Sequence, residues 1–238
     1  MNNKQLKRTI GIITGSGPEA GIDLWKKILN ANKNYLIKEK KRNYRGDEDA
    51  PNVIIYSISE LGRSMHMKDH KDNVWQLLSE LILKISNEVD FFCIACYTLH
   101  CFSKKIEKIT AKEKFVSLFE VISQYIEAET PESACLLHAG ANDLQGCELC
   151  SCMEKYTNLI YPENLQEVRD LIFEVKKNGS DCEDITRRFQ EIIGRISSSS
   201  TIILACTELP LININLKDKS IVDGTQLLAE NMIQKYYQ

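Results

Sequence analysis

Two apolar runs set the expected architecture of the chain. Residues 89–95 (VDFFCIA) and 201–209 (TIILACTEL) each lead into an Ala-Cys pair. Such runs are typical of strands buried inside a parallel sheet. They would deliver Cys96 and Cys206 to strand carboxyl ends, outside which open α/β sheets bind small ligands. The repeated pattern predicts two similar half-structures that each contribute one thiol to a shared cleft.

Strand-like and helix-like segments alternate along the whole chain, which predicts parallel sheets with helices on their faces. Pro18 suits the first turn of a helix, Asn178-Gly179 a helix end, and Thr225 a helix N-cap. Strands are expected at 8–13, 53–58, 89–95, 115–119, 134–138, 157–161, in the run from 201, and at 221–222; helices are expected at 18–32, 69–88, 99–109, 120–128, 142–155, 162–177, 182–196 and 225–236.

The expected fold class is therefore α/β, with two similar domains, each a parallel sheet flanked by helices, and a shared cleft between them. We place the first domain at residues 1–112 plus 219–238 and the second at 113–218. A chain of 238 residues is long enough for one large or two small domains.

Composition narrows the possible partners. The net charge of −3 argues against nucleic acid, because phosphate binding requires a basic excess or a basic face. The basic stretch 38–45 is followed at once by Asp47-Glu48-Asp49 and is interpreted as a solvated loop. We expect no membrane span and no signal peptide, hence a cytoplasmic protein. The nine cysteines are then expected to be reduced thiols.

Three stretches carry a resemblance to a known family: 10–20 (IGIITGSGPEA), 92–100 (FCIACYTLH) and 203–211 (ILACTELPL). Together they resemble the signatures of the aspartate/glutamate racemase family. The Cys-Thr-Glu of the third is more similar to the aspartate racemase branch than to the glutamate branch, which has His at that place. The resemblance covers nearly the whole chain. It implies a cofactor-independent racemase, a small dicarboxylic amino acid as substrate, and a terminal helix packed on the first domain; a homodimer would fit it.

The two thiols suit the chemistry that the resemblance implies. Moving a proton on and off an α-carbon without pyridoxal phosphate needs one acid or base on each face of a flat carbanion. A thiol has a pKa near enough to neutrality to serve as both. Cys96 and Cys206 are the catalytic candidates, and the turns that follow them supply N–H groups for a carboxylate. The alternative is a pair of buried, inert cysteines.

Other residues are assigned to the substrate through the resemblance. Thr98 and Thr207 match the signature Thr positions, and Ser16 lies in the Gly-rich loop. Arg63 resembles the Arg that fixes a side-chain carboxylate in the aspartate branch. Lys177 matches a family Lys that reaches the distal carboxylate, with Lys176 as the neighbour it could be confused with.

The sequence also departs from the family pattern. Tyr97 stands where the family normally has Asn, and so large a side chain could close part of the pocket or admit a different ligand. The strand at 134–138 ends in His138-Ala139-Gly140-Ala141 in place of a Thr-rich turn. Two alternatives therefore stay open: a related Cys-dependent isomerase or lyase acting on another small carboxylate, or a ligand-binding protein that keeps the racemase fold with little turnover.

Metal and redox sites are not expected. Cys93 and Cys96 lie about 10 Å apart along a strand, too far for a disulfide. Cys147, Cys150 and Cys152 could in principle hold zinc, but a second pair of ligands at the usual spacing is missing. Of the four histidines, His100 is the one expected near the cleft.

Overall fold

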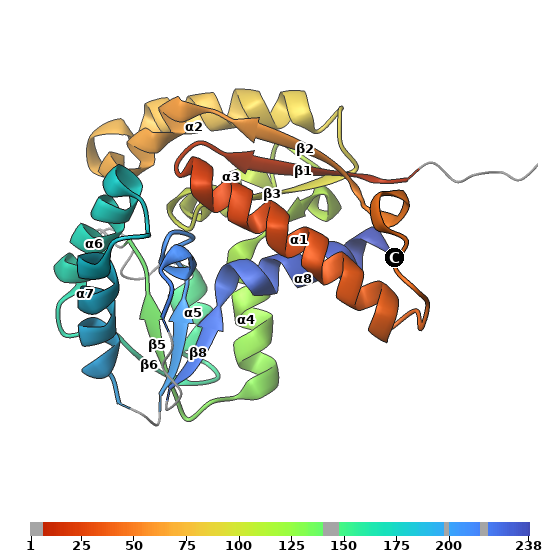
Figure 1. Ribbon diagram of the computed structural model, residues 1–238. Helices are drawn as coiled ribbons and strands as arrows, with labels where there is room; N and C mark the ends of the chain where they lie inside the picture. The colour runs from red at the N-terminus through yellow and green to blue at the C-terminus, as the bar shows by residue number, and fades with distance from the viewer. Residues whose placement is uncertain (1–6, 140–147, 198–199, 215–218) are drawn as a thin grey trace, which may run out of the picture.

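The computed structural model describes residues 7–139, 148–197, 200–214 and 219–238 and contains two four-stranded parallel sheets flanked by helices (Figure 1). The predicted fold class is confirmed. The first sheet has the order β2-β1-β3-β4 and the second the order β6-β5-β7-β8. Their strands are β1 (Thr9–Thr14), β2 (Asn52–Ser57), β3 (Phe91–Ile94), β4 (Phe115–Val116), β5 (Ser133–Leu137), β6 (Asn158–Ile160), β7 (Thr201–Leu204) and β8 (Ser220–Asp223). The two orders are the same when each sheet is counted from its own first strand, so β3 and β7 occupy equivalent central places.

The helices alternate with the strands as the sequence pattern predicts. They are α1 (Pro18–Lys38), α2 (Met67–Ile85), α3 (Ser103–Ile106), α4 (Leu118–Glu129), α5 (Glu148–Met153), α6 (Leu165–Asn178), α7 (Glu183–Gly194) and α8 (Gly224–Tyr236). Three 3-10 segments matter for the site, namely η2 (Ser59–His66), η3 (Thr98–Phe102) and η6 (Leu209–Leu211).

The expected helix at 99–109 is wrong in its length and type. The chain forms η3 and then the single turn of α3. The His100 carbonyl accepts from the backbone N–H of Ser103, which is a 3-10 contact, and from the Ser103 hydroxyl at 2.7 Å. Residues 98–100 and 102 are buried, so the segment lacks the exposed side of an amphipathic helix.

Helix ends follow local capping chemistry. Gly179 closes α6 with a positive φ of 82°, as the Asn-Gly pair predicts. The predicted N-cap Thr225 is wrong, because the cap of α8 is Asp223. The Asp223 carboxylate accepts from the backbone N–H groups of Thr225 and Gln226 at 2.8 and 3.1 Å. A carboxylate next to the positive end of a helix is favourable as well.

Two strands belong to the opposite sheet from the one that the predicted domain limits assign to them. β4 pairs with β3 in the first sheet, and β8 pairs with β7 in the second. α8 then leaves the second sheet and runs beside α1 under the first (Figure 1), where the resemblance puts the terminal helix. The division into domains as a whole stays a prediction.

One apolar core extends through both sheets. Ile12 of β1 and Ile203 of β7 belong to the same cluster, together with residues of α1, α4 and α8. α2 covers the opposite face of the first sheet, and α6 and α7 cover the opposite face of the second. In the described part of the chain, no helix is both long enough and apolar enough to cross a membrane.

α1 packs closely on the end of β1 at Gly21. A Cβ at Gly21 would lie 2.6 Å from Cβ of Thr14, whose hydroxyl donates to the Gly17 carbonyl at 2.9 Å. We expect Gly21→Ala to lower the free energy of unfolding by about 1–3 kcal/mol, the usual effect of overpacking. Urea unfolding followed by circular dichroism measures the change.

Gly194→Ala is the matched control, because nothing lies within 4 Å of a Cβ at Gly194 in α7. This variant should be neutral or more stable by up to about 1 kcal/mol. Equal unfolding free energies for the two variants would contradict the packing argument.

Candidate active site

The carboxyl ends of β3 and β7 meet through their loops. Ala95 continues β3 by donating its N–H to the Ile13 carbonyl at 2.8 Å, and the Cys206 N–H bonds to the Leu137 carbonyl at 3.3 Å. The Thr207 hydroxyl donates across the gap to the Ala95 carbonyl at 3.3 Å. The residues just before Cys96 and just after Cys206 are therefore in direct contact.

Cys96 lies among hydroxyl groups. Its thiol donates to Oγ of Ser16 at 3.2 Å, and Oγ of Ser64 lies 3.9 Å from its Sγ. The two serine hydroxyls are 2.7 Å apart, and all three side chains are buried. Ser64 was not among the residues predicted for the site; it is one residue from Arg63, and no pattern in the sequence marked it.

The turn that presents Ser16 depends on Gly15. Its φ is +117°, and a Cβ there would lie 2.0 Å from the Ile58 carbonyl oxygen. Only glycine fits both conditions. The Gly-rich loop of the sequence thus places a hydroxyl beside Cys96.

Cys206 has a carboxylate neighbour. Its thiol donates to Oε2 of Glu208 at 3.0 Å, and the other carboxylate oxygen pairs with the ammonium of Lys176. Burial raises the pKa of Cys206 well above its usual value, and the charge of Glu208 raises it further, whereas Lys176 acts in the opposite direction. Glu208 stands inside the quoted Cys-Thr-Glu signature, which could have identified it as a site residue.

Lys176 reaches the centre of the site. Its ammonium also donates to the Ser16 carbonyl. Burial alone would lower the pKa of Lys176, but the electrostatic attraction of Glu208, Cys96 and Cys206 outweighs it, and the pKa is raised. The ammonium therefore joins a neighbour of each thiol, namely Ser16 beside Cys96 and Glu208 beside Cys206.

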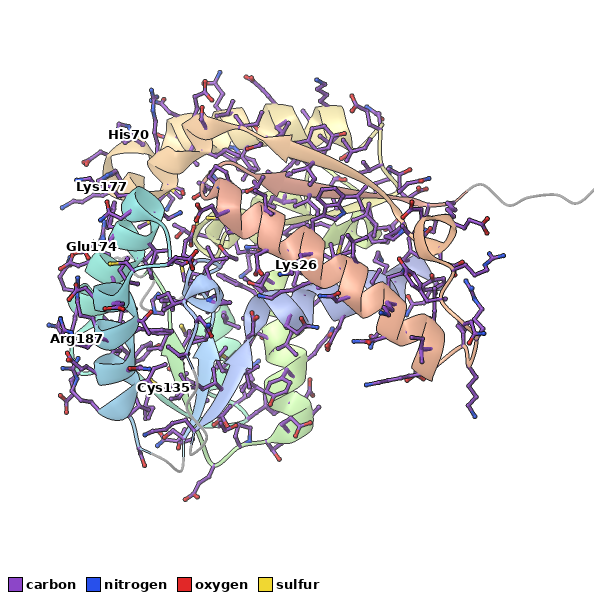
Figure 2. All side chains as sticks on the ribbon, in the orientation of Figure 1. Lys26, His70, Cys135, Glu174, Lys177 and Arg187 are labelled. Atoms are coloured by element: carbon purple, nitrogen blue, oxygen red, sulfur yellow. The ribbon has the colours of Figure 1, made fainter. Side chains whose placement is uncertain are left out.

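The phase of α6 explains why Lys176, and not Lys177, points inward. The buried stripe of α6 consists of Val168, Leu171, Ile172 and Val175. At about 100° per residue, Lys176 falls on the flank of this stripe and Lys177 on the side opposite to it. Lys177 is exposed at the carboxyl end of α6 (Figure 2). The assignment of the family Lys to position 177 stays untested, but the geometry favours position 176.

A cavity of about 560 Å³ reaches Ser16 and Glu208, which contact the two thiols; neither thiol is itself among the described residues that line it. It is lined by the turn at 16–20, by η2, by α6 and by the loop after β7. Met65, Phe173 and Leu211 form an apolar wall, while Lys176 and Glu208 lie at the polar side. The cavity thus combines apolar surface with a few convergent polar groups, as small-molecule sites do. Lys177 also lines its mouth.

The remaining predicted substrate residues differ in placement. Thr98 and Thr207 are buried in the loops that follow the two thiols. Arg63 is exposed on η2 and is not among the described residues that line the cavity. Tyr97 is fully buried, with its ring centroid 5.0 Å from that of Phe119 and in the core cluster shared by both sheets. Tyr97 therefore supports the loop from behind.

Two buried histidines flank the site. Nε2 of His100 accepts from the Leu118 N–H at 3.0 Å, so the proton is on Nδ1, which donates to the Cys96 carbonyl at 2.8 Å. Neutral His100 thereby joins the Cys96 loop to the start of α4. His138 stacks on Tyr97 with centroids 5.1 Å apart, and neither of its ring nitrogens has a hydrogen-bond partner among the described residues. Burial lowers the pKa of both histidines to about 4, against the opposing effect of the Cys96 carbonyl at His100.

The described cysteines are free thiols, as expected for a reduced protein. Among residues 7–139, 148–197, 200–214 and 219–238, no group of three or more His, Cys, Asp or Glu side chains is arranged to hold a metal ion. Cys147 lies outside the described residues, so the predicted absence of a metal at Cys147, Cys150 and Cys152 is not tested.

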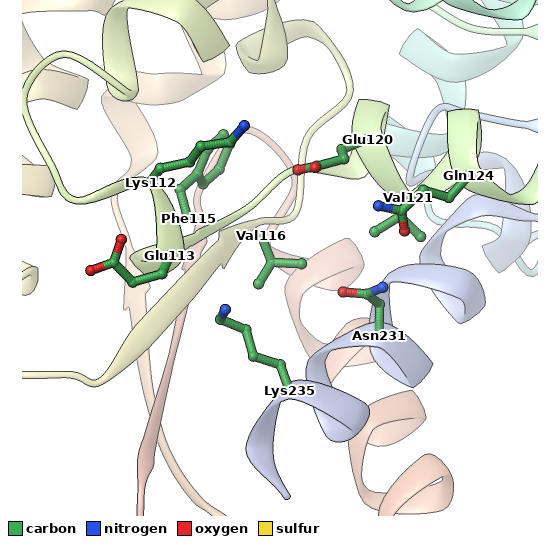
Figure 3. A pocket seen from close by; sticks show the side chains of 9 residues that line it. All are labelled: Lys112, Glu113, Phe115, Val116, Glu120, Val121, Gln124, Asn231 and Lys235. Atoms are coloured by element: carbon green, nitrogen blue, oxygen red, sulfur yellow. The ribbon is translucent and has the colours of Figure 1, made fainter. Parts of the chain in front are cut away.

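A separate hollow of about 390 Å³ lies between β4, α4 and α8 (Figure 3). Lys112, Glu113, Glu120 and Lys235 give it charges of both signs. None of the predicted site residues lines this hollow.

Comparison with known proteins agrees with the fold. Neither a protein-family model nor a curated protein matches the sequence. Among solved structures, the aspartate racemase of Picrophilus torridus superposes with a TM-score of 0.77 over 97% of this chain and 94% of that one, at 21% identity. An aspartate racemase homologue from Pyrococcus horikoshii has a TM-score of 0.67 and 20% identity, covering 97% and 100% of the two chains.

The glutamate racemase of Campylobacter jejuni is also similar, with a TM-score of 0.65 and 13% identity over 95% of this chain and 85% of that one. The chain thus has the two-domain α/β fold of aspartate and glutamate racemases. At these identities the similarity concerns the fold, and it confirms the structural part of the resemblance seen in the sequence.

The buried histidines predict a loss of stability in mild acid. Below about pH 6.5 the unfolded chain binds protons at His100 and His138, whereas the folded protein takes them up only near pH 4. The free energy of unfolding should therefore fall as the pH drops from 6.5 to 4, by up to about 3 kcal/mol for each histidine.

His138→Phe should remove one of these two contributions while keeping an aromatic ring beside Tyr97. Urea unfolding between pH 4 and pH 7 should then show a smaller decrease for the variant than for the wild type. The same decrease in both proteins would contradict the assignment of His138 as a buried neutral base.

Proposed function

We propose that the protein is a cofactor-independent amino-acid racemase that acts on aspartate or glutamate by a two-thiol proton transfer. The observation that carries the proposal is the pair of strand-end thiols, whose loops are joined by the Thr207–Ala95 hydrogen bond and by Lys176, which binds Ser16 beside Cys96 and Glu208 beside Cys206. The racemase fold of the neighbouring structures supports the same reaction class.

In this mechanism the substrate α-carbon lies between Cys96 and Cys206. One sulfur, as thiolate, takes the α-proton, and the other, as thiol, gives its proton to the opposite face of the carbanion. Thr98, Thr207 and the N–H groups of their turns hold the α-carboxylate. Lys176 stabilises the negative charge that passes from one sulfur through the carbanion to the other, because its ammonium binds Ser16 beside Cys96 and Glu208 beside Cys206.

Replacing either thiol tests the mechanism. Cys96→Ser and Cys206→Ser each put a hydroxyl of much higher pKa in place of an essential acid or base, so racemisation should fall by several orders of magnitude in both directions. Each variant should retain at most slow exchange of the α-proton in D₂O, for opposite enantiomers of aspartate or glutamate. Proton NMR follows exchange, and chiral chromatography follows inversion.

Cys182→Ser is the control, since Cys182 is a partly exposed thiol at the start of α7. It should racemise at the wild-type rate. A Cys96 or Cys206 variant that does the same would exclude the two-thiol mechanism. Loss of CO₂ or rearrangement by the wild type would indicate a lyase or another isomerase, and binding without exchange would indicate a ligand-binding protein.

The two neighbouring lysines provide a second test. Lys176→Met removes the cation that joins the neighbours of the two thiols and should lower kcat/KM by about 100-fold or more, as loss of a buried charged donor does. Lys177→Met removes an exposed cation at the mouth of the cavity and should change kcat/KM by less than about 10-fold. Steady-state kinetics with both enantiomers measures the two effects, and the reverse order would assign the role to Lys177.

A further inference from the structure

Glu208 is an unusual carboxylate in this protein. Among the described residues, only Asp49 and Glu208 are buried acids. Asp49 is neutralised by Arg42 and Arg45 at some distance from the candidate site. Glu208 has the single cation Lys176 and touches a proposed catalytic sulfur. A buried acid in such a position calls for a role beyond packing.

The two oxygens of Glu208 make different contacts. Oε1 pairs with Lys176, while Oε2 accepts from the Cys206 thiol at 3.0 Å and lies 3.3 Å from the hydroxyl oxygen of Thr207. A carboxylate in an ion pair has no proton to donate. The proton in the contact between Cys206 and Glu208 therefore belongs to sulfur.

Cys96 is placed among groups of another kind. The hydroxyls of Ser16 and Ser64 can accept from a thiol or donate to a thiolate, so they tolerate either form of Cys96. The two thiols thus occupy equivalent strand ends in unequal electrostatic surroundings.

We propose that Glu208 is the positioning residue that holds Cys206 as the thiol acid of the resting site and leaves Cys96 to act as the base. This inference rests on the proposed two-thiol racemase. The resting form then takes the enantiomer whose α-hydrogen faces Cys96. The C–H bond breaks as the Cys96 S–H bond forms, and Cys206 gives its proton to the opposite face.

Product release leaves the opposite protonation form, with a Cys206 thiolate facing the Glu208 carboxylate. The enzyme returns to its resting form when Cys206 takes a proton from water and Cys96 releases one, so protons balance over the cycle. The charged and titratable groups found around the Cys206 sulfur are Glu208 on its own loop, Lys176 on α6 and, through Lys176, Cys96 across the cleft. Burial and Glu208 raise the pKa of Cys206, in agreement with the geometry.

Variants that keep only one of the two thiols show the influence of Glu208 on each thiol separately. In the Cys96→Ser background, α-proton exchange with D₂O depends on a Cys206 thiolate. We expect Glu208→Gln to speed this exchange by at least about 10-fold at pH 7 and to move its pH profile at least about one unit lower. In the Cys206→Ser background, Glu208→Gln should affect exchange through Cys96 by a clearly smaller factor, because Glu208 contacts the Cys206 sulfur directly and reaches Cys96 only by way of Lys176 and Ser16.

Matched variants separate the proposed role from general damage. Glu208→Asp keeps the carboxylate. In the Cys96→Ser background, its pH profile of α-proton exchange should therefore lie closer to that of the protein with Glu208 than the profile of Glu208→Gln does. Glu191→Gln removes a surface ion pair with Arg187 and should change neither background. The proposal would be overturned if Glu208→Gln left the pH profile of exchange through Cys206 unshifted. Equal shifts of the profile in the Cys96→Ser and Cys206→Ser backgrounds would also overturn it.

Thiol reactivity provides a test that needs neither turnover nor a known substrate. Residue-resolved alkylation of the wild type by iodoacetamide, followed by mass spectrometry between pH 6 and 10, should label Cys96 before Cys206. Glu208→Gln should speed labelling of Cys206 by at least about 10-fold and labelling of Cys96 by a clearly smaller factor. If no variant exchanges the α-proton but this labelling order holds, the proposed function fails, while the effect of Glu208 on the protonation of Cys206 stands. Labelling of Cys206 first in the wild type would exclude that role.

Discussion

The ion pair between Lys176 and Glu208 is the interaction on which the site depends. Lys176 comes from α6 of the second half, and it also bonds to the Ser16 carbonyl of the first half. Because its ammonium binds both Ser16 and Glu208, a single charge joins the turn beside Cys96 to the loop beside Cys206. Burying such a charge is unfavourable without a partner, and Glu208 supplies that partner from the loop after β7.

The fold makes this meeting of elements possible. Both sheets have the same strand order, second-first-third-fourth. The third strand of each sheet, β3 in one and β7 in the other, therefore lies at an equivalent central position. The apolar cluster that contains residues of both sheets fixes one half against the other. The Arg169 guanidinium adds a contact between the halves by donating to the Met65 carbonyl at 2.9 Å. The strand ends are therefore held together by a core that is far larger than the site.

Some of this organisation follows from residue order alone. The apolar runs that end in Ala-Cys predict central strands, and the alternation of strands and helices predicts the α/β class; both predictions are correct. Gly179 predicts a helix end because its positive φ is a local requirement. The cap of α8 was misassigned because Asp223 and Thr225 are both good N-cap residues, and only the backbone path selects between them. Likewise, the sheet to which β8 belongs is set by long-range pairing.

The side chains of the site were harder to predict, for a physical reason. Lys176 and Lys177 are indistinguishable by residue type, but the periodicity of Val168, Leu171, Ile172 and Val175 places them on different sides of α6. Ser64 comes from a 3-10 segment without a periodic pattern, so its approach to Cys96 depends on how η2 packs. Tyr97 was assigned to the pocket because it stands where the family normally has Asn, yet its side chain belongs to the shared core. A turn directs successive side chains to different sides, and adjacency in sequence therefore does not imply adjacency in the cleft.

The same ion pair sets the electrostatic condition for a substrate. Lys176 is already neutralised by Glu208, so a carboxylate that binds Lys176 must share it with Glu208 or displace it. Displacement would move the acceptor away from the Cys206 sulfur, which makes binding and thiol protonation interdependent. A substrate ammonium would instead be attracted to Glu208 and leave the ion pair in place. The proposed α-amino acid substrate carries both groups, and this combination allows Lys176 and Glu208 each to gain a partner of opposite charge within the same small space.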